Sequence, residues 1–234
     1  MKIGILCAGD REAAPFFPWI ERCCIKEKAM LRIHEGLVEN TEVAVLFSGV
    51  CKVNAAIAAQ ILIDTFGCDA IINCGTAGAM DERLKVFDTV ISTEAAYHDV
   101  ADGILTQFHP WLESACFKAD EALVHLAAKS AEEIHHPGSI HLGRMMTGEQ
   151  FIKKDACDQI NQRYAPLCVD METSSVAHVC YVNRIPFVAV RTMTDAPRDG
   201  EDTAFEQNCD QASQISAEIV RQMLKLMSQK GMDQ

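Results

Sequence analysis

The sequence contains no apolar run that could span a membrane and no recognisable leader segment. Its longest apolar runs, such as residues 55–63, fall far short of the roughly 20 residues that a membrane-spanning helix needs. Residues 1–6 contain one lysine and no small-residue cleavage site, and they are typical of a first strand. We therefore expect no membrane partner.

Positive charge is scarce. The chain has 21 lysines and arginines against 33 aspartates and glutamates, which gives a formal net charge of −12. A surface this acidic repels phosphate backbones, which argues against nucleic acids and anionic membranes as partners. A single nucleoside is not excluded, because one local site can differ from the surface as a whole.

The cysteines and histidines form no metal or redox motif. None of the 11 cysteines belongs to a Cys-x-x-Cys pair, and no histidine cluster has zinc-type spacing. We therefore expect neither a metal nor a cofactor. Most cysteines lie among apolar residues, as free thiols do in a reducing compartment, so we predict a cytoplasmic protein. The adjacent Cys23 and Cys24 are interpreted as part of a helix end.

Two common catalytic signatures are also missing. Gly4 and Gly9 do not fit the Gly-x-Gly-x-x-Gly fingerprint of dinucleotide-binding proteins. The nucleophile elbow of many hydrolases, Gly-x-Ser-x-Gly, is absent as well. Any catalytic side chains must therefore belong to other motifs.

What the chain does have is an alternation of strand-like and helix-like segments. Runs rich in valine and isoleucine predict strands over residues 2–8, 31–38, 42–47, 69–74, 88–94, 140–147, 167–171 and 186–194. Other runs predict helices over residues 52–66, 120–134, 172–182 and 205–227.

The pattern predicts a three-layer α/β fold, in which helices flank a central twisted mixed sheet that is mainly parallel. Several strands are apolar almost throughout, which indicates a sheet covered on both faces. No linker, repeat or low-complexity tract interrupts the alternation, so residues 1–234 are expected to form one domain.

Ligands of such sheets bind beyond the carboxyl ends of the strands, so the residues just after each strand are the candidates for chemistry. After the first strand, Gly9 leads into a helical turn that contains Asp10 and Glu12. Glu12 either caps that helix or points into the cleft, and Asp10 is available as the cap.

Asp195 follows the last predicted strand. It ends an apolar run, and such surroundings favour the neutral form of a carboxyl group, as a general acid requires. The alternative is an aspartate that forms a turn before Ala196 and Pro197.

Two further strand ends carry candidate residues. In Gly75-Thr76-Ala77-Gly78, two glycines would let the backbone approach a ligand, or they would form an ordinary tight turn. In Asp170-Met171-Glu172, acids lie where a strand meets a helix. Glu172 could cap that helix, or it could accept hydrogen bonds from the two hydroxyls of a ribose.

Together these segments resemble the bacterial methylthioadenosine/S-adenosylhomocysteine nucleosidases, within the purine nucleoside phosphorylase-like family. The resemblance extends over nearly the whole chain. The matching motifs are Ser48-Gly49-Val50 with Lys52-Val53, Gly75-Thr76-Ala77-Gly78, Tyr97-His98-Asp99, Gly148-Glu149-Gln150-Phe151-Ile152, Met171-Glu172 with Ala177-His178-Val179-Cys180, and Arg191 through Asp195.

The resemblance implies a role for each matching residue. Glu12 would activate the attacking water, Asp195 would protonate adenine at N7, and Glu172 would accept from the ribose hydroxyls. The implied substrate-binding residues are Val50, Thr76, Ala77, Gly78, Gln150, Phe151, Ile152, Val169, Met171, Arg191, Thr194 and Phe205. Among them, Phe151 would stack on the purine.

The resemblance also implies a homodimer, in which the partner subunit lends residues to the pocket for the 5′-substituent. Residues 100–116 would help to shape this pocket, and Phe108 and Trp111 could cover an alkylthio group there. Some residues depart from the family's pattern: Cys51 replaces a usual glycine and Asp170 a usual glutamate, whereas Gly9 stands where methionine is frequent. These departures leave the preferred 5′-substituent open.

The implied roles form a coherent hydrolysis. Adenine leaves poorly until it is protonated, the transition state resembles an oxocarbenium ion, and water must attack the opposite face of the sugar. The expected function is hydrolysis of the N-glycosidic bond of 5′-methylthioadenosine and S-adenosylhomocysteine, with 5′-deoxyadenosine as a further candidate.

Two rival functions stay open. A phosphorylase needs cations for phosphate, and the family's phosphorylases carry an arginine where this chain has Asn73. Arg11, which follows a Gly-Asp turn, is a cation that still favours a phosphorylase. The other rival is a nucleoside-binding module without catalysis, against which the presence of all three acids argues.

Overall fold

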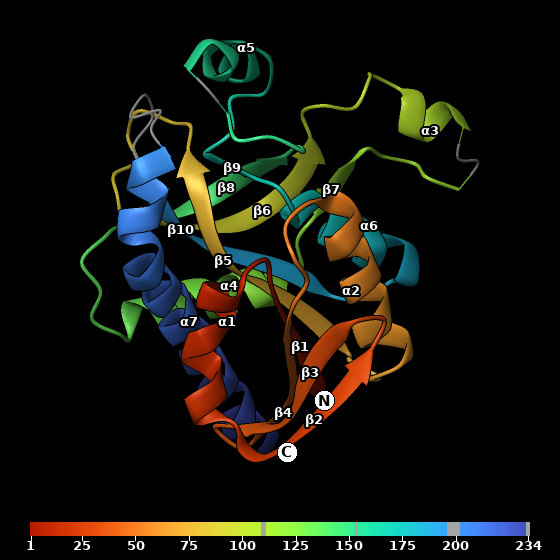
Figure 1. The fold of residues 1–234 in the computed structure, drawn as a ribbon, viewed down its shortest axis with the longest axis vertical. Helices are drawn as coiled ribbons and strands as arrows, with labels where there is room; N and C mark the ends of the chain where they lie inside the picture. Colours follow the sequence, from red (N-terminus) through yellow and green to blue (C-terminus); the bar gives the residue numbers. More distant parts are fainter. Residues whose placement is uncertain (109–110, 153, 196–201, 233–234) are drawn as a thin grey trace.

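The strands form one large sheet (Figure 1). The computed structural model describes residues 1–108, 111–152, 154–195 and 202–232. In chain order, its strands are β1 (Lys2–Cys7), β2 (Glu21–Lys28), β3 (Leu31–Val38), β4 (Thr41–Phe47), β5 (Ala70–Ala79), β6 (Thr89–Tyr97), β7 (Cys116–Lys118), β8 (Ile140–Thr147), β9 (Cys168–Asp170) and β10 (Phe187–Asp195).

The strand order is β10-β6-β8-β9-β5-β1-β4-β3-β2, with β7 on β6 and a further pairing between β10 and β5. Because of that further pairing, five strands close into a ring, β1, β4, β3 and β2 continue from β5 as an open sheet, and β7 adds to β6. Within the described residues, five pairings are parallel and five antiparallel. The predicted mixed sheet is confirmed. The expectation of a mainly parallel sheet is wrong, because the hairpins and short strands pair antiparallel.

Helices cover both faces of the sheet, as expected for three layers. They are α1 (Asp10–Ala13), α2 (Lys52–Asp64), α3 (Ile104–Phe108), α4 (Glu121–Glu132), α5 (Lys154–Tyr164), α6 (Thr173–Asn183) and α7 (Asp202–Met232), and a 3₁₀ helix (Ala14–Trp19) follows α1. The long α7 packs with α1 and α4 on one side, and α2 packs with α6 on the other (Figure 1). No helix in the described part of the chain is both long enough and apolar enough to cross a membrane.

The core lies between these layers. β1 is buried from Ile3 to Cys7 and β10 from Phe187 to Thr194, as continuous apolar strands require. The helix predicted over residues 120–134 begins with a cap, because the Asp120 carboxylate accepts a hydrogen bond of 3.0 Å from the Leu123 N–H.

Two predictions fail in the periphery of the sheet. Cys23 and Cys24 lie in β2 and not at a helix end. All eight residues of β2 are exposed and five of them are charged, so no hydrophobic pattern marked this edge strand. The helix α5 was missed as well, because its sequence is mostly polar.

A third prediction fails at the centre. Gly75 through Gly78 form no turn, since β5 continues to Ala79. Its backbone stays paired, because Gly75 is in register with Arg191 of β10 and Gly78 with Val169 of β9. The turn considered at Ala196 and Pro197 lies outside the described residues.

Candidate active site

A cavity of about 700 Å³ opens at the carboxyl ends of β1, β5, β9 and β10. Every residue predicted to act on or bind the substrate lines it, with the exception of Arg191. The lining includes Glu12, Val50, Thr76, Ala77, Gly78, Gln150, Phe151, Ile152, Val169, Met171, Glu172, Thr194, Asp195 and Phe205. These residues are far apart in the sequence, and they meet at the carboxyl ends of the strands, where ligands of such sheets bind.

Glu12 is held by donors on both carboxylate oxygens. Oε2 accepts from the backbone N–H groups of Ala8 at 2.7 Å and Gly9 at 3.0 Å. Oε1 accepts from the N–H of Thr76 at 2.7 Å and from its hydroxyl at 3.0 Å. Glu12 therefore combines the two alternatives that the sequence left open. It accepts hydrogen bonds from backbone N–H groups at the start of α1, and it also lines the cavity. Asp10 accepts a hydrogen bond of 2.8 Å from the adjacent Arg11 N–H.

The close approach of Glu12 to β5 depends on Gly75. A Cβ at residue 75 would overlap the Glu12 carboxylate and would lie 2.9 Å from Arg191 Nη1. The glycines of β5 were expected to admit a ligand. Gly78 does line the cavity, but Gly75 instead makes room for a carboxylate.

Arg191 lies beneath the cavity floor as a fully buried cation. Its guanidinium is 3.6 Å from Glu12 Oε1, 3.2 Å from Asp170 Oδ2 and 3.4 Å from Glu172 Oε2. It also donates to Asn73 Oδ1 at 2.8 Å. A buried charge needs such partners, so Arg191 links three acids from two strand ends: Glu12 after β1, and Asp170 and Glu172 at the end of β9.

Asp170 and Asn73 belong to this cluster, although the sequence analysis assigned neither of them a role in it. Asp170 accepts from the Thr147 hydroxyl at 2.6 Å and from the Thr173 N–H at 3.1 Å, so it caps α6 in place of Glu172. Asn73 is fully buried and donates to the Leu6 carbonyl at 2.9 Å. The available signal was a polar residue inside an apolar strand, which has to find buried partners.

Glu172 occupies the N-cap position of α6, but its side chain makes no capping bond. It turns instead to the start of α2, where Oε1 accepts from the Cys51 N–H at 2.9 Å. Burial raises the pKa of Glu172 to about 7; the Arg191 charge opposes the rise, and the charges of Asp170 and Glu12 add to it. The Glu172 carboxyl group, which faces the cavity, is therefore close to half ionised at neutral pH.

Asp195 ends β10 at the edge of the cavity. The Thr194 hydroxyl donates to its Oδ1 at 3.0 Å, and Asp195 is in register with Gly78. A Cβ on Gly78 would lie 3.4 Å from Asp195 Oδ2, so the two strands meet closely here. Asp195 and Glu12 therefore lie on either side of the carboxyl end of β5.

Two aromatic rings flank the outer part of the cavity. Phe151 and Phe205 pack edge to face with ring centroids 6.1 Å apart. Phe151 remains 64% exposed, so most of its ring is available to a ligand.

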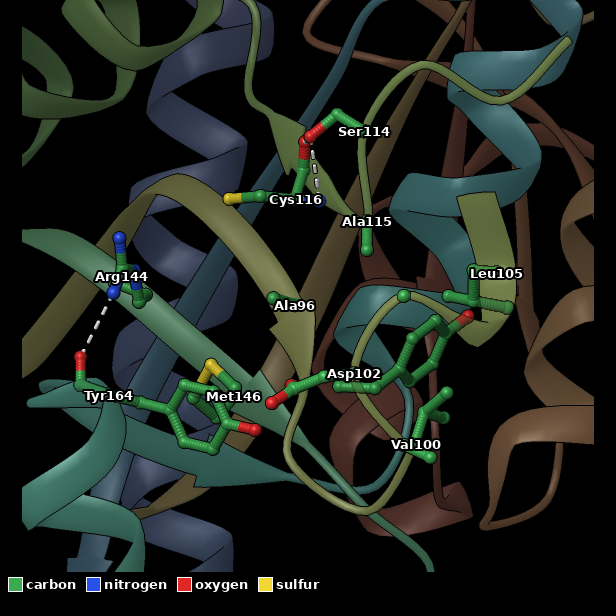
Figure 2. A pocket seen from close by; sticks show the side chains of 13 residues that line it. Ala96, Val100, Asp102, Leu105, Ser114, Ala115, Cys116, Arg144, Met146 and Tyr164 are labelled. Atoms are coloured by element: carbon green, nitrogen blue, oxygen red, sulfur yellow. Dashed lines mark hydrogen bonds between the residues drawn. The ribbon is translucent and has the colours of Figure 1, made fainter. Parts of the chain in front are cut away.

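None of the described residues of 100–116 lines this cavity, so their expected contribution to the 5′ pocket stays a prediction. Their described residues instead line a second cavity of about 300 Å³, together with Arg144, Met146 and Tyr164 (Figure 2). In that cavity Arg144 donates to the Tyr164 carbonyl at 3.0 Å, as Figure 2 shows. Phe108 and Trp111 are 77% and 80% exposed and lie outside both cavities.

The charge of the main cavity is strongly negative. The acids that line it are Asp10, Glu12, Asp170, Glu172, Asp195 and Glu206. Within the described residues, Arg11 is the one cationic side chain of the lining. Its guanidinium already pairs with Glu206 at 2.9 Å and with Asp210 at 2.6 Å.

Comparisons with known proteins agree with this arrangement. The family model described as "Phosphorylase superfamily" matches residues 2–225. The 5′-methylthioadenosine/S-adenosylhomocysteine nucleosidase of Staphylococcus carnosus (strain TM300) is 36% identical over 203 residues, which cover 84% of this chain and 87% of the relative.

Solved structures of related enzymes share the fold. The nucleosidase of the same name from Colwellia psychrerythraea 34H, in complex with adenine, has a TM-score of 0.89 and 32% identity over 96% of this chain and 94% of that one. The futalosine hydrolase of Helicobacter pylori strain 26695 has a TM-score of 0.86 and 26% identity over 96% of this chain and 97% of that one. The chain therefore belongs to the phosphorylase superfamily and, within it, to the 5′-methylthioadenosine/S-adenosylhomocysteine nucleosidases.

Proposed function

We propose that this chain hydrolyses the N-glycosidic bond of 5′-methylthioadenosine and S-adenosylhomocysteine, releasing adenine and the 5′-thio-substituted ribose. The observation that carries the proposal is the charge of the main cavity. Its acids greatly outnumber its cations, and Arg11 is already paired with two carboxylates. Carboxylates suit an oxocarbenium-like transition state, whereas phosphorolysis would require free cations to hold phosphate.

In this mechanism, Asp195 protonates N7 of adenine, and Thr194 holds the Asp195 carboxyl group in place. Glu172 accepts hydrogen bonds from the ribose hydroxyls in its ionised form. The negative charges of Glu12 and Glu172 stabilise the positive charge that develops on the sugar, and Arg191 keeps both of them in position from below.

Glu12 activates the attacking water. Three of its four donors are backbone N–H groups that cannot turn away, and the fourth is the Thr76 hydroxyl. The hydroxyl can rotate, so a water molecule can take its place on Oε1 and deliver its proton there. The backbone donors meanwhile keep the carboxylate pointed at the cavity.

The remaining lining residues bind the rest of the nucleoside. Phe151 stacks on the purine, with Phe205, Gln150 and Ile152 around it, and Val50, Val169 and Met171 contact the sugar and the 5′ side. Thr76, Ala77 and Gly78 form the strand beneath the ribose. No metal or cofactor takes part in these steps.

The pocket for the 5′-substituent is completed by a second copy of the chain. Three facts support a homodimer: α2 exposes Val53 at 69%, α6 exposes Val182 at 49%, and α3 ends at the exposed Phe108. These helices lie on one side of the molecule (Figure 1). In the dimer, residues 100–116 of the partner cover the 5′ group.

The same proposal includes the setting of the enzyme. The chain works as one domain over residues 1–234, in the cytoplasm, in the salvage of methionine from its thioadenosine by-products. All eleven cysteine positions lie in the described residues and are free thiols, which suits a reducing compartment.

The test is the release of adenine from 5′-methylthioadenosine, S-adenosylhomocysteine, 5′-deoxyadenosine and aminofutalosine, side by side with inosine as a control. Each is assayed with and without phosphate. We expect the thioadenosines to be cleaved at the same rate in both buffers. A rate that depends on phosphate would support a phosphorylase, and tight binding without any cleavage would support a binding module.

A further inference from the structure

Three residues of the matching motifs have no role in the proposed reaction, and the structure places them in contact with one another. Lys52 is the first residue of α2, Asp99 follows β6 by two residues, and Glu149 follows β8 by two residues. The strands β6 and β8 are parallel, with Tyr97 in register with Thr147, so the residues beyond the two strand ends meet. None of the three residues lines the main cavity, so a direct contact with the substrate is not their role.

The carboxylate of Asp99 joins two separate segments of the chain. Lys52 Nζ lies 2.9 Å from Asp99 Oδ1 and 2.9 Å from Oδ2. Oδ2 also accepts from the backbone N–H of Glu149 at 3.0 Å. The side chains of Lys52 and Asp99 are 22% and 27% exposed, so solvent and salt screen this ion pair less than a pair on the open surface.

The start of α2 adds a second bond to the same segment. The Lys52 N–H donates to Glu149 Oε1 at 3.0 Å, and the preceding N–H, that of Cys51, donates to Glu172 Oε1 at 2.9 Å. Backbone N–H groups at the start of a helix lack partners within the helix and favour carboxylates. Adjacent backbone groups therefore bind the proposed ribose-binding carboxylate and the residue that leads to the purine side.

The purine-binding segment, residues 149–151, depends on these bonds. Gln150 and Phe151 line the cavity, but neither makes a hydrogen bond to another residue in the part of the chain that the structure describes. Most of the Phe151 ring is exposed. Its position is therefore set by the backbone that leads to it, and Glu149 is the last residue before it that is hydrogen-bonded.

We propose that Asp99 is a positioning residue for nucleoside cleavage: it fixes Glu149 beside the start of α2 and so sets the position of the purine-binding segment relative to Glu172. The inference rests on the proposed function, which assigns the purine to Phe151 and the ribose to Glu172. Asp99 contacts neither part of the substrate. Its loss should weaken binding on the purine side and leave the acids of the chemical step in place, so the effect is expected in KM and not in kcat.

Two substitutions and their combination test the contact between Asp99 and Lys52. Asp99→Ala removes both partners of the carboxylate, and Lys52→Met removes the cation but keeps the N–H that binds Glu149. We expect KM for 5′-methylthioadenosine to rise about fivefold or more for Asp99→Ala and about two- to threefold for Lys52→Met, as for lost hydrogen bonds. In both variants kcat should stay within about twofold of the parent. The double variant should be no worse than Asp99→Ala, because the two residues act through one contact.

The two products separate the purine side from the sugar side. The dissociation constant of adenine should rise about fivefold or more in Asp99→Ala, whereas that of methylthioribose should stay within about twofold of the parent. Glu39→Gln is the control, because Glu39 is similarly exposed at 26% and pairs with Arg221 outside the cavity lining. It should change neither constant. Thermal unfolding shows that each variant is folded.

Hydrogen exchange keeps the test independent of turnover. The Glu149 amide loses its acceptor in Asp99→Ala, so it should exchange about tenfold faster or more. If the parent binds adenine but releases none from any nucleoside, the proposed function fails, while faster exchange and weaker adenine binding in Asp99→Ala still support the positioning role. Unchanged exchange with parent-like KM would overturn that role. Equal losses of affinity for adenine and methylthioribose would also overturn it, as would effects on KM that multiply in the double variant.

Discussion

The two ends of the main cavity are built in opposite ways. At the inner end, Glu12, Asp170 and Glu172 are 5%, 7% and 3% exposed, and all three face the buried Arg191. At the outer end, Phe151 is 64% exposed, and the described residues of 100–116 lie elsewhere. The groups proposed for the chemistry are thus fixed by the sheet of a single chain. The part proposed to select the 5′-substituent is open in that chain.

The largest effect is expected at the inner end, from Asp195→Asn. The substitution removes the proton that adenine needs, so kcat should fall by roughly 10²–10⁴-fold, the range for a lost acid–base group. Thermal unfolding should change little, because the amide keeps the shape of the side chain. Asp10→Asn is the control, since Asp10 lines the same cavity but is exposed. Turnover near that of the parent would remove Asp195 from the mechanism.

Gly75→Ala should produce the next largest effect. The new Cβ would displace the Glu12 carboxylate and press on Arg191, so we expect kcat to fall by about tenfold or more and stability by about 1–3 kcal/mol. Gly9→Ala is the matched control on the same wall, because a Cβ on Gly9 meets no atom within 4 Å. The rate of adenine release and the midpoint of thermal unfolding are measured for both variants and compared. If the two alanine variants behave alike, Glu12 is not held as tightly as we conclude.

Glu172 should make the inner end sensitive to pH. Its folded-state pKa of about 7 lies above its ordinary value of 4.5, so folding favours the neutral form. The contribution of Glu172 to stability is therefore complete below pH 4.5 and is lost as the pH rises through 7. Glu172→Gln, which is neutral at every pH, should be the more stable protein at pH 8, by about 1–3 kcal/mol, with little difference at pH 4. An equal difference at both pH values would contradict this assignment.

The same substitution tests the contact with the ribose. As the pH falls below 7, Glu172 becomes neutral and kcat/KM of the parent should fall. This limb of the profile should be absent in Glu172→Gln. The variant should also bind normal nucleosides about tenfold more weakly while its affinity for 2′-deoxy analogues changes less. Equal losses for both would reduce Glu172 to a structural residue of the α2–α6 contact.

The smallest effect is expected at the outer end, from Trp111→Ala. If a partner subunit places this ring over the 5′ group, KM for 5′-methylthioadenosine should rise by about three- to tenfold, and KM for adenosine by less. Met30→Ala serves as the control, because Met30 is fully exposed in the turn between β2 and β3. Sedimentation of the parent should show a dimer. The same change in KM for both substrates would place Trp111 outside the 5′ pocket.

The sequence predicted the inner end better than the periphery of the fold. Buried strands such as β1 and β10 carry continuous apolar runs, so their ends, and the acids Glu12 and Asp195, could be located. The edge strand β2 has no such pattern, because all its residues face solvent. The extension of β5 beyond Gly75 could not be predicted from the sequence for a different reason. Its pairing with β10 and β9 is a tertiary contact that local preference does not reveal.

The partners of Arg191 are the part of the site that the sequence could not predict. The resemblance to the family placed it in the pocket, but it lies below the floor and joins three carboxylates. A lone arginine directly after the apolar residues 187–190 indicated that buried partners exist. It did not indicate which ones, because the three acids follow β1 and β9, which only the folded sheet brings next to β10.

The most direct test of the account is the origin of the oxygen that replaces adenine on the sugar. The reaction is run with 5′-methylthioadenosine in heavy-oxygen water that also contains phosphate, and the sugar product is analysed by mass spectrometry. Because the cavity is acidic and Glu12 is proposed to activate the attacking water, we predict free methylthioribose that carries one solvent oxygen. A sugar 1-phosphate without the label would contradict the account and would assign the reaction to a phosphorylase.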